Sequence, residues 1–328
     1  MRKIDYNLEN GFKILFTCVG RRVALINSFR NAAAMLGKNC KICGSDITNL
    51  AAGMQVCDTN YTICTTQSPD YISSLLDIVR RENINIIIPT TDHDLLKIAQ
   101  SRDLFSQNGC FVLVPEPEVI KICQDKRKAF KFLLEKGFKT PETFEPSTIP
   151  DPSSLEYPCF LKPWDGYASR GATVVNSREE YDFYSKRIPN CIVQRYIKGT
   201  EITSDVFTDE SAKVRCVVPR RRIETRGGEV NKAAIVKDQG IIDEVTRLAE
   251  ILKTQLCILT IQLIKTDDGS MYFIEINPRF GGGVPLAIKA GANFPLWLLE
   301  HLCNMECRAD NSYQANLTML RYDAEIWL

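Results

Sequence analysis

With 328 residues, the chain is too long for one compact core, and its length indicates two or three domains. Its 41 basic and 40 acidic residues nearly balance, which excludes an overall field that selects nucleic acid or an anionic membrane. An anionic ligand must therefore be held by a local cluster of charges. The sequence has no apolar run of about 18 residues and no signal-like opening segment, so we expect a cytoplasmic protein with no membrane contact.

The 13 cysteines are odd in number and scattered among apolar runs. This pattern predicts reduced, buried thiols rather than a disulfide framework. Cys40 and Cys43 form a lone CxxC with no second pair at zinc spacing, so a role as small apolar residues is the commoner outcome.

The first part of the chain alternates between apolar strands and helices. Strands are predicted at residues 13–18, 40–45, 84–88 and 111–114. A turn at Gly20 and a helix over residues 21–36 follow the first strand, which is the opening of a doubly wound α/β unit. The turn lacks GxGxxG, so a dinucleotide site has little support. Pro115 and Pro117 mark the exit, and we place the first domain at residues 1–115.

Polar residues 90–94 follow the predicted strand at 84–88. Carboxyl ends of parallel strands are where α/β sheets bind ligands, so Asp92 or Asp94 could contact a substrate. Capping the next helix is the commoner role for such an aspartate. The sequence leaves both roles open.

Two lysines in the middle of the chain are suited to phosphate. Asp125 predicts a helix N-cap, which places Lys126 in the first turn, where phosphate gains from the ammonium and from the helix N-terminus. An exposed surface lysine is the alternative. Lys162 stands in an otherwise apolar strand, which is costly without an anionic partner. The following loop contains Gly166, Ser169 and Gly171 and can fold over phosphates. A plain hairpin loop is the alternative, but it would not explain Lys162.

A strand at residues 191–197 leads to Gly199 and Glu201. Free backbone N–H and C=O groups of an extended segment can pair with an adenine edge. Glu201, a few residues further on, can accept hydrogen bonds from ribose hydroxyls.

A basic run occupies residues 220–232 and includes Gly227 and Gly228. We expect a mobile cationic loop suited to a carboxylate substrate or a terminal phosphate. We count Arg226, next to the glycines, among the catalytic candidates. The alternative is a charge run that faces only solvent.

Two alternating segments near the end, residues 257–265 and 271–277, flank an Asp-Asp-Gly-Ser turn and predict an antiparallel hairpin. Glu275 and Asn277 are two residues apart and share one face. Gln262 joins them if the register of the hairpin allows. Such oxygen donors suit Mg²⁺, which takes one or two carboxylates and leaves other positions to water and phosphate. Arg279 follows them, and the three glycines after Phe280 permit close backbone approach to a ligand.

In this order and combination, these residues resemble the ATP-grasp superfamily, in particular its stand-alone members that are similar to the carbamoyl phosphate synthase large subunit. The resemblance covers nearly the whole chain. It implies a Rossmann-like pre-ATP-grasp domain followed by a two-lobed α+β ATP-grasp domain at residues 116–328, with lobes at about 116–195 and 196–328.

The resemblance also implies roles for single residues. Lys126 and Lys162 would bind the phosphates of ATP under the glycine loop, and Arg279 would face the reacting phosphoryl group. The remaining implied contacts are adenine at Gln194, Tyr196 and Ile197, ribose at Glu201, and Mg²⁺, or Mn²⁺ in its place, at Gln262, Glu275 and Asn277. Arg195 departs from the family pattern, in which many relatives carry an acidic residue.

The expected activity is that of an ADP-forming carboxylate–amine ligase, which activates a small carboxylate as an acyl phosphate for attack by an amine or another nucleophile. The alternatives are a carbamoyl-phosphate-type kinase acting on bicarbonate or carbamate, and a non-catalytic ATP-binding regulatory protein. A homodimer is compatible with the sequence, but nothing in it fixes the oligomeric state.

Overall fold

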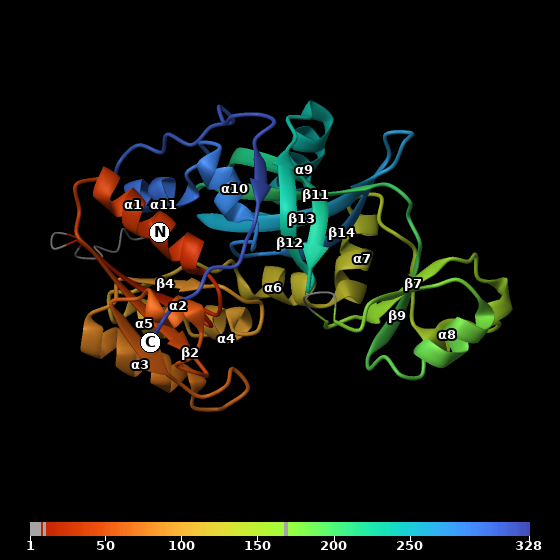
Figure 1. Ribbon diagram of the computed structural model, residues 1–328, viewed down its shortest axis with the longest axis horizontal. Helices are drawn as coiled ribbons and strands as arrows, with labels where there is room; N and C mark the ends of the chain where they lie inside the picture. The colour runs from red at the N-terminus through yellow and green to blue at the C-terminus, as the bar shows by residue number, and fades with distance from the viewer. Residues whose placement is uncertain (1–7, 9–10, 167–169) are drawn as a thin grey trace.

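The computed structural model describes residue 8, residues 11–166 and residues 170–328. The strands of this part form three sheets, of five, six and four strands (Figure 1). This is the α/β fold that we predicted, with a parallel-sheet unit first and antiparallel sheets after it. In Figure 1 the four-stranded sheet lies at the right, apart from the other two.

The five-stranded sheet is parallel and has the strand order β3-β2-β1-β4-β5. Its strands are β1 (Phe12–Thr17), β2 (Cys40–Asp46), β3 (Thr59–Thr62), β4 (Ile86–Pro89) and β5 (Phe111–Val112). The helices of this unit are α1 (Val23–Met35), α2 (Ala52–Gln55), α3 (Tyr71–Glu82), α4 (Leu95–Gln100) and α5 (Arg102–Ser106). All four predicted strands are present. The strand order reverses between β1 and β4, so the loops after these strands flank the crevice where such sheets usually bind ligands.

The six-stranded sheet is antiparallel and has the order β14-β13-β10-β11-β12-β15. Its strands are β10 (Thr200–Thr208), β11 (Val214–Arg226), β12 (Glu229–Ile235), β13 (Cys257–Lys265), β14 (Met271–Asn277) and β15 (Thr318–Leu320). The helices of this part are α9 (Gln239–Leu252), α10 (Val284–Lys289) and α11 (Phe294–Leu302). Apolar residues of α9 pack on one face of the sheet, among them Val245 and Leu248.

The opposite face shares a hydrophobic core with the five-stranded sheet. This core joins apolar residues of β1 and α1 to residues of β11, α10 and α11. An edge-to-face aromatic series connects them, with ring centroids 5.4 Å apart for Phe16 and Phe29 and 5.7 Å for Phe29 and Phe280. The five-stranded and six-stranded sheets therefore share one continuous core. A division into two domains at residue 115 stays a prediction.

The four-stranded sheet has the order β6-β9-β7-β8 and a small core of its own. Its strands are β6 (Thr143–Phe144), β7 (Cys159–Pro163), β8 (Thr173–Val175) and β9 (Cys191–Arg195). Its helices are α8 (Arg178–Tyr184) and the 3-10 turns η1 (Pro146–Thr148) and η2 (Pro152–Ser154), while α6 (Pro117–Gln124) and α7 (Lys126–Glu135) precede it. Residues 196–199 connect β9 to β10, so they link this small lobe to the six-stranded sheet.

The prediction of a mobile cationic loop at residues 220–232 is wrong. These residues form most of the antiparallel hairpin of β11 and β12, with Gly227 and Gly228 at its turn. Alternation along β11 turns Arg220 inward, where it is 1% exposed, and its guanidinium donates to both oxygens of Asp205 at 2.6 and 2.9 Å. The charge of Arg220 is therefore paired inside the sheet with that of Asp205, a residue 15 positions away in the sequence.

All thirteen cysteines lie in the described part of the chain and are free thiols; six of them are buried, as predicted, and seven are half-buried. Burial raises the pKa of several of them, including Cys40 and Cys57, each to about 12, so these thiols stay protonated and unreactive near neutral pH. Across residues 11–166 and 170–328, none of the helices has the length and apolar character to span a membrane.

Candidate active site

The hairpin of β13 and β14 aligns the predicted metal ligands. Gln262 stands directly opposite Glu275, and Thr260 stands opposite Asn277. Directly opposed residues of neighbouring strands share one face of the sheet. The register condition for Gln262 is therefore met, and three side-chain oxygen donors lie together on one face.

The N-terminus of α7 faces this hairpin. Asp125 caps the helix, as predicted, by accepting a hydrogen bond from the backbone N–H of Arg127 at 2.9 Å. The ammonium of Lys126, the first residue of α7, lies 3.5 Å from Oε1 of Glu275 and donates to the carbonyl of Gly166 at 2.6 Å. The helix N-terminus, its lysine and the start of the glycine loop therefore meet at the face of the predicted metal ligands.

Lys162, on β7, lies in the same electrostatic cluster. Burial, and next the charge of Lys126, lower its pKa to about 8, against the opposing effects of Glu275 and Glu201. Burial alone would raise the pKa of Glu275, but Lys126, Lys162 and Arg279 outweigh it and hold that pKa below its ordinary value. The site thus combines an ionised carboxylate with lysines that an anion would stabilise.

Arg279 is held by the first sheet. Its Nε and Nη2 donate to Oδ2 of Asp92 at 3.0 and 2.6 Å, and its Nη1 donates to the carbonyl of Phe280 at 3.1 Å. Asp92 therefore does not cap α4, one of the two roles that we considered for it; it connects the loop after β4 to the end of the hairpin. Asp94 precedes α4 but makes no side-chain cap; it is buried and accepts hydrogen bonds from Thr17 and Tyr71.

Arg222 is a site residue that the sequence analysis did not single out. Its Nη1 donates to Glu201 and lies 3.5 Å from Oε1 of Gln262, and its Nη2 donates to the carbonyl of Gly228 at 3.1 Å. The strand alternation that buries Arg220 also turns Arg222 inward. Glu201, the ribose candidate, is therefore paired with an arginine in this structure.

The hinge candidates lie at the junction of the two lobes. Gln194 is buried at the end of β9 and donates to Oγ1 of Thr143 at 2.8 Å, while Tyr196 and Ile197 belong to the connection to β10. The predicted strand at residues 191–197 thus ends two residues early, at Arg195.

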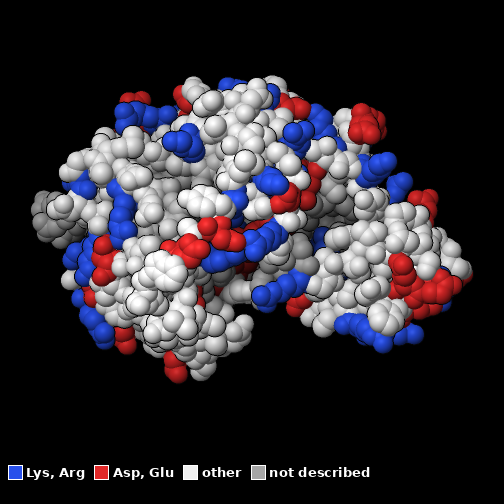
Figure 2. Space-filling view, viewed as in Figure 1, with Lys and Arg blue, Asp and Glu red and all other residues white. Residues whose placement is uncertain are grey.

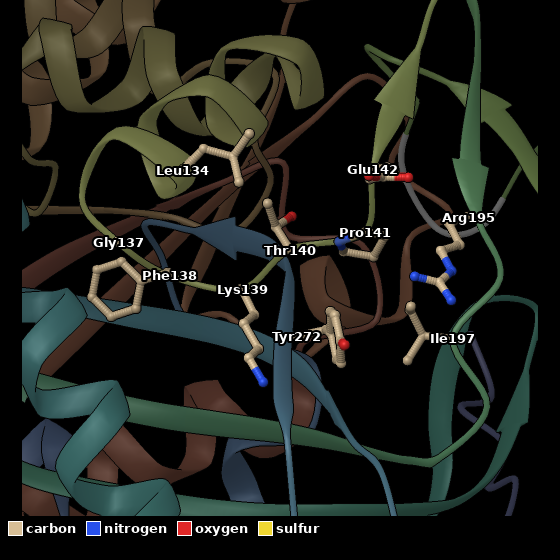
Figure 3. Close-up of a pocket in the computed structure, with 10 residues that line it drawn as sticks. All are labelled: Leu134, Gly137, Phe138, Lys139, Thr140, Pro141, Glu142, Arg195, Ile197 and Tyr272. Atoms are coloured by element: carbon tan, nitrogen blue, oxygen red, sulfur yellow. The ribbon is translucent and has the colours of Figure 1, made fainter.

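A cavity of about 450 Å³ adjoins this hinge (Figure 3). Arg195 and Ile197 line it together with Lys139 and with Tyr272 of β14. Its lining includes neither lysine of the candidate site and none of the metal-ligand candidates. We therefore locate the candidate chemistry at the polar face of the hairpin and not in this cavity.

The remaining candidates are divided between the site and the surface. Gly166 meets Lys126, whereas Gly171 begins the return to β8 with φ +71° and Ser169 lies outside the described residues. Arg226 is exposed at the end of β11 and pairs with Asp323 at 2.7 Å. The structure therefore gives Arg226 a surface partner and does not bring it to the cluster of Glu275.

Two family models match this chain: the ATP-grasp domain at residues 123–283 and the PylC-like N-terminal domain at residues 14–113. The chain therefore contains an ATP-grasp domain that follows a PylC-like N-terminal domain. The D-alanine–D-alanine ligase of Fusobacterium nucleatum is 26% identical over 172 residues, which are 49% of this chain and 58% of that enzyme. The carbamoyl phosphate synthase large chain of Thermotoga maritima is 24% identical over 243 residues, 68% of this chain and 22% of that protein. The chain thus spans less than two thirds of the length of these two relatives.

Solved structures share the fold of this chain. The N5-carboxyaminoimidazole synthetase of Staphylococcus aureus complexed with ADP has a TM-score of 0.75 at 14% identity, covering 95% of this chain and 82% of that one. The L-amino acid ligase of Bacillus licheniformis has a TM-score of 0.71 at 17% identity, covering 93% and 76%. The fold of these two solved structures therefore extends over nearly the whole of this chain.

Proposed function

We propose that this ATP-grasp protein is an ADP-forming ligase that activates a small carboxylate with ATP and joins it to an amine or another nucleophile. The observation that carries the proposal is the single face on which Glu275, Gln262 and Asn277 lie beside Lys126 and Lys162. Relatives and structural neighbours with ligase names support the same class of reaction. We propose small-molecule substrates only, and no nucleic acid or membrane partner.

The donor set of the hairpin suits Mg²⁺, with Mn²⁺ as a substitute. Within the described ranges there is no group of three or more His, Cys, Asp or Glu residues that could hold a metal. One carboxylate and two amides leave about three of the six octahedral positions of Mg²⁺ to phosphate oxygens and water, which suits its preference to keep such ligands. When bound, the ion would neutralise the charge of the phosphates of ATP.

The proposed chemistry needs positioning and neutralisation of charge, and no nucleophilic side chain. A carboxylate oxygen of the substrate attacks the γ-phosphorus, the bond to the bridging oxygen breaks, and ADP leaves. The amine then attacks the acyl carbon, phosphate departs and the amine loses a proton. Lys126 and Lys162 hold the phosphates, and Arg279 faces the phosphoryl group as charge is redistributed. Arg226 remains a candidate catalytic residue, but the protein would have to change conformation to bring it from the surface to the cluster of Glu275.

The proposal is tested by ADP release from Mg·ATP across pooled small carboxylates combined with pooled amines and amino acids. We expect release that requires one acid pool and one amine pool. Release that needs bicarbonate alone would favour the carbamoyl-phosphate-type kinase. Tight Mg·ATP binding without release from any pool would contradict the ligase and favour a regulatory ATP-binding protein.

The affinity for Mg·ATP should fall as pH rises through about 8. Burial lowers the pKa of Lys162 to about 8, so its ammonium loses the proton there, whereas an ordinary lysine stays charged to about 10.4. Phosphate binds the charged form, so ATP binding takes up a proton. Titration of a fluorescent ATP analogue at a series of pH values measures this dependence. Lys162→Arg keeps its charge and should lack the step; a step of the same size in that variant would contradict the assignment.

A further inference from the structure

Three arginines converge on one carboxylate beside the turn that carries Arg279. Glu229, the first residue of β12, lies 3.5 Å from the guanidiniums of Arg21 and Arg321 and 3.6 Å from that of Arg22. Charge-assisted N–H···O bonds are shorter, at about 2.7–2.9 Å. Glu229 therefore shares its charge among three guanidiniums without a short hydrogen bond to any of them.

Arg22 and Arg321 come from opposite ends of the chain and meet at Gly282. Arg22 follows β1, at the crevice where the strand order of the first sheet reverses. Arg321 follows β15 and donates to the carbonyl of Gly282, and its backbone N–H donates to the carbonyl of Asn231 at 3.0 Å. A Cβ on Gly282 would lie 2.8 Å from Nη1 of Arg22, so the glycine leaves room for the arginine in the position it occupies here.

These two arginines are poorly solvated and incompletely neutralised. The side chains of Arg22 and Arg321 are only 18% and 31% exposed, whereas that of Arg21 is 76% exposed. Burial is the main cause that lowers the pKa of both Arg22 and Arg321. Beside them, Asp92 is occupied by Arg279, so Glu229 is the nearest carboxylate for the pair. Acidic and basic atoms gather around a hollow at the centre of the face shown in Figure 2.

We propose that Arg22 and Arg321 bind a second anionic group, a carboxylate or a phosphate, on the acid substrate. The inference rests on the proposed function. The reacting carboxylate of the substrate would lie toward Arg279 and the face of Glu275, and Gly282 follows Arg279 by three positions. The second group would lie between the two guanidiniums against the Gly282 turn. The substrate class is therefore a bifunctional acid: a dicarboxylic acid or a phosphorylated carboxylic acid.

Substitution of Glu229 should raise the affinity of this site for an anionic ligand. Its carboxylate competes with any ligand anion for the same guanidiniums, so Glu229→Gln should bind a dianionic acid more tightly, while Arg22→Gln and Arg321→Gln should bind it roughly 10- to 100-fold more weakly. Changes of opposite sign at neighbouring positions distinguish anion binding from a general loss of structure.

These affinities are compared by calorimetric titration. The full chain is titrated with Mg²⁺ and a non-hydrolysable ATP analogue bound. The probes are glutarate, 3-phosphonopropionate and the monoanion butyrate. We expect one of the two dianions to bind more tightly than butyrate; which one does so distinguishes a second carboxylate from a phosphate-like group. Arg178→Gln, which removes an exposed arginine of the small lobe, is the matched control and should leave every affinity unchanged.

Equal affinity for butyrate and both dianions, or dianion affinities that do not change in Arg22→Gln and Arg321→Gln, would overturn the inference. Arg22→Lys, which keeps the charge, serves if Arg22→Gln does not fold, and it should retain a preference for dianions. Affinity for the ATP analogue separates this test from that of the proposed function. If the analogue binds and ADP release occurs with monoanionic acids alone, the ligase stands and only the second anion site fails.

Discussion

Glu275→Gln should lower turnover about 100-fold or more, as removal of a transition-state electrostatic group does in other enzymes. The substitution keeps the shape of the side chain and removes its charge. Glu275 is the carboxylate among the proposed metal ligands, lies 3.5 Å from the ammonium of Lys126 and stands opposite Gln262. Its loss would weaken the metal site and leave two lysines without their shared anion. Steady-state ADP release at several Mg²⁺ concentrations measures the effect.

Glu244→Gln is the control for this prediction. Glu244 lies on α9, which covers the opposite face of the same sheet, and it pairs with Arg247 near the surface. Its substitution removes the same charge from the same sheet unit without touching the polar face. Normal turnover and normal Mg²⁺ dependence in Glu275→Gln would remove this residue from the metal site. Equal losses in both variants would indicate a general effect of charge.

That Glu275 and Asn277 share one face could be predicted because the information is local. Alternation along residues 271–277 places Glu275 and Asn277 on one face whatever the rest of the chain does. The position of Gln262 could not be predicted in this way, because a one-residue shift in pairing moves a strand's side chains to the other face. The pairing of β13 with β14 shifts its register between Gln262 and Leu263, and no pattern in the sequence predicts this shift.

The arginine contacts depended on distant partners and were missed for that reason. Consecutive arginines at residues 220–222 are typical of solvated segments. In the structure Arg220 pairs with Asp205, and Arg222 pairs with Glu201, both on β10. The glycines after Phe280 indicated close approach to a ligand. The nearest groups around them in the structure are protein side chains: a Cβ on Gly281 would lie 2.7 Å from Oγ1 of Thr260, and one on Gly283 would lie 2.2 Å from Nη1 of Arg220.

Asp205→Ala should lower the free energy of unfolding by about 3–5 kcal/mol, the usual cost of removing one partner of a buried ion pair. Asp205 and Arg220 are 0% and 1% exposed, so the guanidinium left behind could not be rehydrated without opening the sheet. Urea denaturation followed by circular dichroism gives the difference. Asp323→Ala, which breaks the exposed pair with Arg226, should cause no measurable loss.

Replacing both partners separates the ion pair from the packing that surrounds it. In Asp205→Leu with Arg220→Met, no buried charge remains, so most of the lost stability should return, as it does when buried pairs are exchanged for apolar residues. Because Arg220 also packs against Gly283, close to Arg279, the double variant should still release ADP less efficiently than the native chain. A single variant as stable as the native chain would show that water reaches Arg220. A double variant with full activity would show that the position of Arg279 does not depend on this pair.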